Sequence, residues 1–199
     1  LGTTNPATKL HVEDGEITIS DGTTCHQIGT NDSNLYFGNS ALSSLTTGVC
    51  NVAVGCVALK DTTIGRNNTA FGHGALKSNT TGNYNVAIGS ISQECSTTSQ
   101  CNISIGYLSL RVNEGNDNVA IGVNALTANT TGGCNIAIGK AALTDNTIGE
   151  CNTAIGWGSL SNNTTGCYNT SIGFYSMLCN TIGSQNLAIG RSSLRLNTT

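Results

Sequence analysis

Residues 135–143 read Asn-Ile-Ala-Ile-Gly-Lys-Ala-Ala-Leu, and close variants of this stretch recur along the chain at a fixed interval. The glycine of each copy, called the repeat glycine below, occurs ten times, and successive copies are 17 residues apart except for one interval of 16. The repeat glycines are Gly38, Gly55, Gly72, Gly89, Gly106, Gly122, Gly139, Gly156, Gly173 and Gly190. A fixed period of this kind predicts a stack of equal units, in which each unit covers its neighbours and the whole forms a rod.

The composition limits the class of protein. Of the 199 residues, 10% are charged and 5% are aromatic, and the formal net charge is −3. The chain has no basic patch of the kind that binds nucleic acid and no apolar run long enough to cross a bilayer, so we expect neither a nucleic-acid partner nor membrane insertion. So few aromatic residues suit a thin, stacked interior better than a thick globular core.

The repeats divide the chain into two parts. Residues 34–199 form one array, which we interpret as the β-solenoid, and residues 1–33 form an N-terminal linker strand segment. The chain does not begin with Met and stops within a repeat at Thr199, so we interpret it as a fragment of a longer fibre.

The three residues that precede each repeat glycine alternate in size. The residues one and three before it, called the flanking positions, are mostly Ile, Val, Leu, Phe or Thr, whereas the residue two before it, called the small position, is Ala or Ser in nine of ten repeats. This alternation predicts a short strand. We expect the large flanking residues to face the interior of the coil, and the small residues to face a closely packed second copy of the chain.

The rest of each repeat predicts a second strand and a turn. A pair such as Ala142-Leu143 follows most repeat glycines, and elements such as Asn163-Thr164-Thr165-Gly166 come after it, with Asn and Gly suited to left-handed turn conformations. The predicted fold class is therefore all-β, a parallel β-roll or β-solenoid of about ten 17-residue turns. A three-sided hexapeptide β-helix is the competing fold, because Ile-Gly-x-x-Ala matches one hexapeptide unit, although only one such unit is recognisable per turn.

An asparagine stands four residues before every repeat glycine. We predict that these side chains form an internal ladder in which each amide bonds to the next, as in other stacked β structures. The ladder residues are Asn34, Asn51, Asn68, Asn85, Asn102, Asn118, Asn135, Asn152, Asn169 and Asn186.

The motif Asn-x-Ala-Ile-Gly-x-x-Ala-Leu resembles the head repeat of trimeric bacterial adhesins, and this resemblance implies a parallel β-roll with three chains around one axis. The longer turns with Asn-Thr-Thr-Gly are similar to repeats in bacteriophage tail fibres and related virus fibres. The stretch from Leu1 to Val12, followed by Asp14-Gly15 and Ile17–Ile19, is similar to a linker strand of such fibres. The resemblance implies a homotrimer on a virion surface or otherwise extracellular, with other fibre or baseplate proteins as partners and a role in host-surface attachment.

Two alternative functions stay open at this point. The chain could be the head of a bacterial trimeric surface adhesin, or an ice- or crystal-binding β-solenoid, because its turns repeat Thr-Thr. Ice binders need a regular threonine face, and here the threonine pairs lapse at Ser96, Glu114 and Ile148.

The sequence offers no convergent catalytic set. Of the three histidines, His11, His26 and His73, only His73 lies in the array, and the acidic residues are scattered over its turns, with Asp145 and Glu150 the nearest pair. We therefore expect no enzyme activity, no cofactor and no metal site.

Two further features are candidates for function. Cys134 and Cys151, two of nine cysteines, stand at equivalent places on adjacent repeats and could form a disulfide. The residue directly after each repeat glycine, called the following position, varies freely, and stacking aligns these residues as one stripe along the rod. We predict a possible glycan-contact stripe in which aromatic and cationic side chains alternate, although it could also be a variable surface or pack on a neighbouring chain. Its members are Tyr107, Lys140, Trp157, Phe174 and Arg191.

Overall fold

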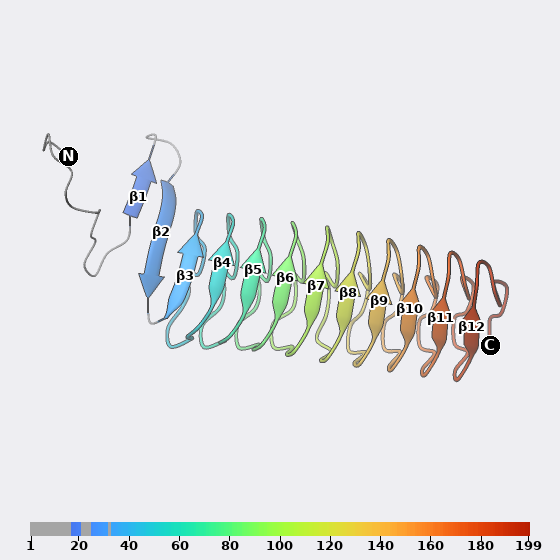
Figure 1. The fold of residues 1–199 in the computed structure, drawn as a ribbon. Coiled ribbons are helices and arrows are strands. Elements are labelled where there is room, and N and C mark those ends of the chain that lie inside the picture. The colour runs from blue at the N-terminus through green and yellow to red at the C-terminus, as the bar shows by residue number, and fades with distance from the viewer. Residues whose placement is uncertain (1–16, 21–24, 32) are drawn as a thin grey trace, which may run out of the picture.

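The computed structural model describes residues 17–20, 25–31 and 33–199, and side chains from Ser33 onward. Its elements form one twelve-stranded sheet in which the strands follow chain order (Figure 1). The all-β solenoid predicted from the repeats is confirmed. The stretch from Leu1 to Val12 lies outside the described residues, so its linker role and the boundary at residue 33 stay predictions.

The first two strands differ from the rest. β1 (Ile17–Ser20) pairs antiparallel with β2 (Cys25–Asn31), and β2 pairs antiparallel with β3 (Asn34–Phe37), so the N-terminal hairpin continues directly into the solenoid sheet. From β3 onward all pairs are parallel, and about nine turns of the coil link ten strands. The remaining strands are β4 (Val52–Val54), β5 (Thr69–Phe71), β6 (Val86–Ile88), β7 (Ile103–Ile105), β8 (Val119–Ile121), β9 (Ile136–Ile138), β10 (Thr153–Ile155), β11 (Thr170–Ile172) and β12 (Leu187–Ile189).

Equivalent residues stack in register from turn to turn. Ala120 pairs with Ala137 across β8 and β9, and Ser104 pairs with Ala120 across the single 16-residue interval, so the missing residue does not shift the strands. Along residues 33–199 each turn contributes one strand, which excludes the three-sided hexapeptide fold.

The shortened turn keeps its hydrogen bonds through Glu114. In ordinary turns a threonine N–H donates to a threonine carbonyl of the next turn, as Thr80 does to Thr97 at 2.9 Å. Where the residue is missing, the main-chain N–H of Thr97 donates to Glu114 Oε1 at 2.8 Å and that of Thr98 donates to Oε2 at 3.0 Å. Partial burial opposes the charged carboxylate, but these bonds and those from both threonine hydroxyls outweigh it and lower the pKa of Glu114.

Glu114→Ala is expected to lower the free energy of unfolding by about 1 kcal/mol at pH 7, because two main-chain donors lose their acceptors at a partly solvated site. Since folding lowers the pKa of Glu114, its contribution is fully present above the ordinary value of 4.5 and is lost as the pH falls through the lowered pKa. Urea unfolding of both proteins at pH 7 and pH 3 measures this. Glu150→Ala, at another exposed turn carboxylate, is the control; equal effects of the two substitutions would contradict the assignment.

The strands present their faces in the opposite sense to the one expected. The small positions from Ala53 to Ala188 are buried inside a single chain, whereas the flanking positions point outward and stay exposed or half-buried. The prediction that large residues fill the coil and small residues meet a second copy is therefore wrong. The physical reason is that leucine and asparagine side chains from the rest of each turn already occupy the narrow interior, so only Ala or Ser fits on the strand.

The predicted second strand is also absent from the turns that the structure describes. The Ala-Leu pair lies in a tight turn, and its leucine has a positive φ, for example 52° at Leu126 and 51° at Leu143. From Leu59 to Leu160 these leucines are fully buried and stack next to the small positions. The turn conformation aims each leucine into the coil, while its N–H still bonds to the next turn, as Leu126 N–H does to the Ala142 carbonyl at 2.9 Å.

One polar layer divides this core into two hydrophobic clusters. Gln93 takes the place of the stacked leucine and is fully buried, and its Nε2 donates to Asn85 Oδ1 at 3.3 Å and Ser99 Oγ at 3.1 Å. Beside it, Ser92 and Ser104 share a 2.6 Å hydrogen bond between hydroxyls at positions that are alanines in turns such as that of Ala137 and Ala142. The layer adjoins the shortened turn, so both irregularities of the array lie together.

The ladder asparagines lie inside the coil. Each Oδ1 accepts a hydrogen bond from the main-chain N–H of the next ladder asparagine, as Asn135 Oδ1 does from Asn152 at 3.0 Å. Each Nδ2 from Asn34 to Asn169 donates to a main-chain carbonyl three residues before the next ladder asparagine, for example Asn135 to Gly149 at 2.8 Å. Bonds between side-chain amides also occur, but among the hydrogen bonds described Asn118 Nδ2 and Asn135 Nδ2 donate none to the preceding ladder asparagine, so the ladder depends mainly on the main-chain donors.

A second asparagine ladder was not anticipated. The asparagine of the Asn-Thr-Thr-Gly element was interpreted as a left-handed turn residue, but it is buried and bonds to its equivalents. Asn146 Nδ2 donates to Asn129 Oδ1 at 2.8 Å and to the Gly149 carbonyl at 3.0 Å, and Asn163 continues the pattern. Its recurrence seven residues after the repeat glycine was the available signal in the sequence.

Candidate functional site

The flanking positions of β3 to β12 form a continuous and largely apolar surface, which we call the outer face and which includes Thr69, Thr153 and Thr170. Ten three-residue stretches at strand spacing make it roughly 43 Å long and 10 Å wide. Its most exposed members are Leu35, Phe37, Phe71, Ile88, Ile103, Ile136, Leu187 and Ile189. Contiguous apolar patches of a few hundred square ångströms on soluble proteins mark interaction sites.

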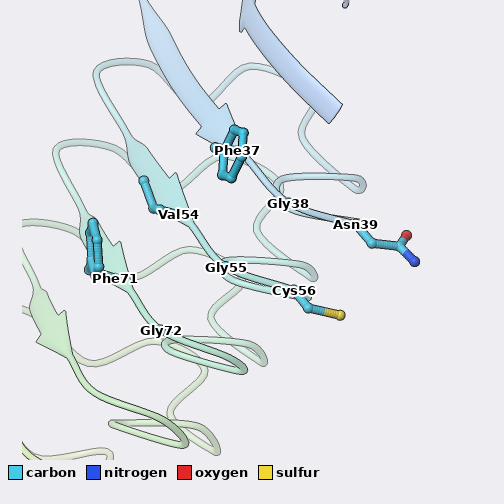
Figure 2. Close-up of a pocket in the computed structure, with 8 residues that line it drawn as sticks. All are labelled: Phe37, Gly38, Asn39, Val54, Gly55, Cys56, Phe71 and Gly72. Atoms are coloured by element: carbon cyan, nitrogen blue, oxygen red, sulfur yellow. The ribbon is translucent and has the colours of Figure 1, made fainter. Parts of the chain in front are cut away.

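A shallow groove borders the outer face over the first repeat glycines (Figure 2). It has a volume of about 420 Å³ and is lined by Phe37, Gly38, Asn39, Val54, Gly55, Cys56, Phe71 and Gly72. Figure 2 shows the flanking side chains on one side of the glycines and the following-position side chains of Asn39 and Cys56 directed away from them. At these turns the repeat glycines therefore lie between the outer face and the stripe of following positions.

Four of the five predicted stripe residues come together at the C-terminal end of the coil. Lys140 Nζ lies 5.3 Å from the centre of the Trp157 ring, Trp157 meets Phe174 edge-to-face with ring centres 5.3 Å apart, and Arg191 lies 5.6 Å from the Phe174 ring. Tyr107 stands two turns before Lys140 and makes no ring or cation–π contact with the described residues. The predicted stripe thus contains one contiguous group and one isolated tyrosine.

Two members of this group were missed in the sequence. Tyr175 packs against Phe174 with ring centres 4.2 Å apart and against Trp157 at 5.9 Å, and Arg195 lies 5.8 Å from the Tyr175 ring. Neither residue is at the following position, so the stripe alone did not indicate them. Gly158 was the available signal, because a Cβ there would lie 2.5 Å from the Tyr175 ring, which occupies the space that glycine leaves.

Cys134 and Cys151 are both free thiols on adjacent turns, so the possible disulfide is not formed in this structure. Burial, followed by the neighbouring Cys134 thiol and the Glu150 carboxylate, raises the pKa of Cys151. Raised values keep the thiol protonated at neutral pH, whereas a nucleophilic cysteine needs a lowered pKa. The Cys151 environment therefore does not activate it as a nucleophile.

Titratable side chains do not converge on a reactive centre in the described part of the chain. His73 is exposed at a following position, Asp145 and Glu150 are exposed on turns, and Glu114 is engaged by Thr97 and Thr98. Glu114, Asp117 and Glu150 line a hollow of about 280 Å³. Among the described residues, no group of three or more His, Cys, Asp or Glu side chains has an arrangement that could hold a metal ion.

Threonine hydroxyls in the turns also have structural partners. Thr147 Oγ1 donates to the Thr164 carbonyl of the next turn at 2.9 Å, and Thr164 Oγ1 donates to the Thr181 carbonyl at 3.0 Å. Threonine therefore recurs in the turns because its hydroxyl bonds each turn to the next.

Within residues 17–20, 25–31 and 33–199, no helix has the length and apolar character needed to cross a membrane. Comparison with known proteins gave no matching family model, no matching curated protein and no matching solved structure.

Proposed function

We propose that this chain is a structural segment of a homotrimeric fibre on a phage or virus tail or surface, in an extracellular setting, and that it contributes to host-surface attachment. The observation that carries the proposal is the outer face, an apolar surface that runs along the whole array and is not covered within one chain. A second and third copy of the chain fit it, because equal chains repeat at the same spacing and each can present its own outer face to a common axis. The number three rests on the resemblance to adhesin heads.

A fibre segment needs length and rigidity more than chemistry. Stacked turns with two internal asparagine ladders make each unit dependent on its neighbours, which suits a rod that holds a binding tip away from a particle. Other fibre or baseplate proteins would then join its ends. The proposal gives the chain no enzymatic role.

The ice-binding alternative receives less support from the structure. Threonine hydroxyls at the first position of the threonine pairs are used between turns, and Glu114 interrupts their row. A head domain of a bacterial adhesin would use the same outer face, so it differs from the fibre proposal in biological setting rather than in assembly.

The assembly is tested by placing charges on the outer face. Ile103→Lys together with Ile136→Lys is expected to convert the trimer to monomers, because both side chains are 38% exposed in one chain and would be buried at the common axis. Sedimentation equilibrium of the 199-residue chain measures the mass. Circular dichroism checks that the variant keeps the folded coil.

Ile148→Lys is the matched control, because Ile148 is 51% exposed but lies on a turn away from the outer face. It should leave the mass at three chains. A monomeric parent protein, or a double variant that remains trimeric, would contradict assembly through this surface.

A further inference from the structure

Aromatic and cationic side chains gather at one place on the coil, which we call the aromatic–cationic cluster: Lys140, Trp157, Phe174, Tyr175, Arg191 and Arg195. It contains the only tryptophan of the chain, one of three phenylalanines and three of eight basic residues. Aromatic and basic residues are both scarce in this chain, yet these six lie within four successive turns. That concentration singles out this surface from the rest of the rod.

The cluster is cationic although the chain as a whole is acidic. No Asp or Glu follows Glu150 in the sequence, and the described residues provide no ion pair to Lys140, Arg191 or Arg195. All three cations are exposed. Cations that lack a carboxylate partner and are held over aromatic rings are available to an anionic ligand.

The aromatic rings are held in place but remain accessible. Phe174 meets Trp157 edge-to-face at 89°, and Tyr175 fits over Gly158, so the three rings support one another across adjacent turns. Trp157 nevertheless keeps 47% of its surface exposed. A fixed, open indole offers apolar contact to the C–H faces of a sugar ring at little cost in side-chain entropy.

The cations lie at both ends of the rings. Lys140 and Arg191 are three turns apart, which corresponds to roughly 14 Å along the rod at strand spacing. Trp157 and Phe174 occupy the two turns between them. A linear ligand that lies along the rod could therefore stack on the rings and pair anionic groups with Lys140 at one end and with Arg191 and Arg195 at the other.

We infer that the aromatic–cationic cluster is a binding site for an acidic oligosaccharide, with sulfate or carboxylate groups on the cations and a sugar ring on Trp157. This inference deepens the proposed role in host-surface attachment by naming the class of ligand. All six side chains belong to one chain, so the site is complete without assembly of the trimer.

The test measures binding of a fluorescent heparin-derived hexasaccharide to the 199-residue chain by anisotropy, with neutral maltohexaose as comparison. The parent protein should bind the acidic sugar, more weakly as salt is raised, and should not bind maltohexaose measurably. Trp157→Ala should weaken binding by about tenfold or more, and Arg191→Gln should both weaken binding and flatten its dependence on salt.

Tyr107→Ala is the matched control, because Tyr107 is also at a following position and is 50% exposed but makes no ring or cation–π contact with the described residues. It should bind like the parent. Absence of binding by the parent, unchanged binding by Trp157→Ala, or equal binding of maltohexaose would overturn the inference. The mass of each sample, measured in parallel, shows whether the trimer forms, independently of whether the sugar binds. Failure of the assembly proposal and failure of the binding proposal are therefore distinguishable.

Discussion

Gly122→Ala is expected to disrupt the coil at its centre and to lower the free energy of unfolding by at least about 4 kcal/mol. Gly122 has a φ of 139°, a backbone conformation that residues other than glycine avoid. In addition, an added Cβ would lie 2.6 Å from both the carbonyl carbon and the carbonyl oxygen of Gly139. The obstacle is main chain of the next turn, so it cannot rotate away. Thermal and urea unfolding, followed by circular dichroism, measure the loss.

Gly74→Ala provides the matched control for this substitution. Gly74 has a φ of 66°, and an added Cβ would meet nothing closer than Glu94 Oε1 at 4.0 Å. Other turns place a non-glycine residue at the equivalent point, such as Ala141 with a φ of 56°. We expect a change within about 1 kcal/mol. If the two variants were equally stable, close stacking would not be the reason for the repeat glycines.

Asn135→Ala is expected to cost about 3 kcal/mol, because it removes three buried hydrogen bonds from the middle of the array. Asn135 Nδ2 donates to the Gly149 carbonyl at 2.8 Å, and its Oδ1 accepts from Asn152 N–H at 3.0 Å and from Asn152 Nδ2 at 3.2 Å. Alanine leaves the buried main-chain N–H of Asn152 without its acceptor. Because this N–H group is buried and cannot bond to water instead, the substitution costs more than the loss of a solvent-exposed contact.

Urea unfolding of the Asn135→Ala variant, compared with that of the Asn162→Ala variant, measures the effect. Asn162 is exposed on a turn, and its side chain makes no hydrogen bond with the described residues, so its replacement should change stability by no more than about 0.5 kcal/mol. Similar stability of the two variants would mean that the internal ladder contributes little to holding the turns together.

The sequence by itself determined the period, the parallel strands and the buried asparagines. A repeat glycine every 17 residues with an asparagine four residues before it permits few arrangements other than equal turns stacked in register. The aromatic and basic residues at the following positions could likewise be aligned by counting, because stacking brings equivalent residues of successive turns together. These features depend on position along the repeat, which the sequence states directly.

Only the tertiary structure decided which way the strands face and what fills the coil. Alternation at Ile136, Ala137 and Ile138 defines two faces but does not say which is inside, and the usual preference for large apolar residues in the core gave the wrong answer. The inside is set by the space left after Leu143 and the asparagine ladders enter it, which depends on the positive φ of residues in the turn. The contacts of Tyr175 over Gly158 and of Glu114 with Thr97 depend in the same way on how one turn lies upon the next.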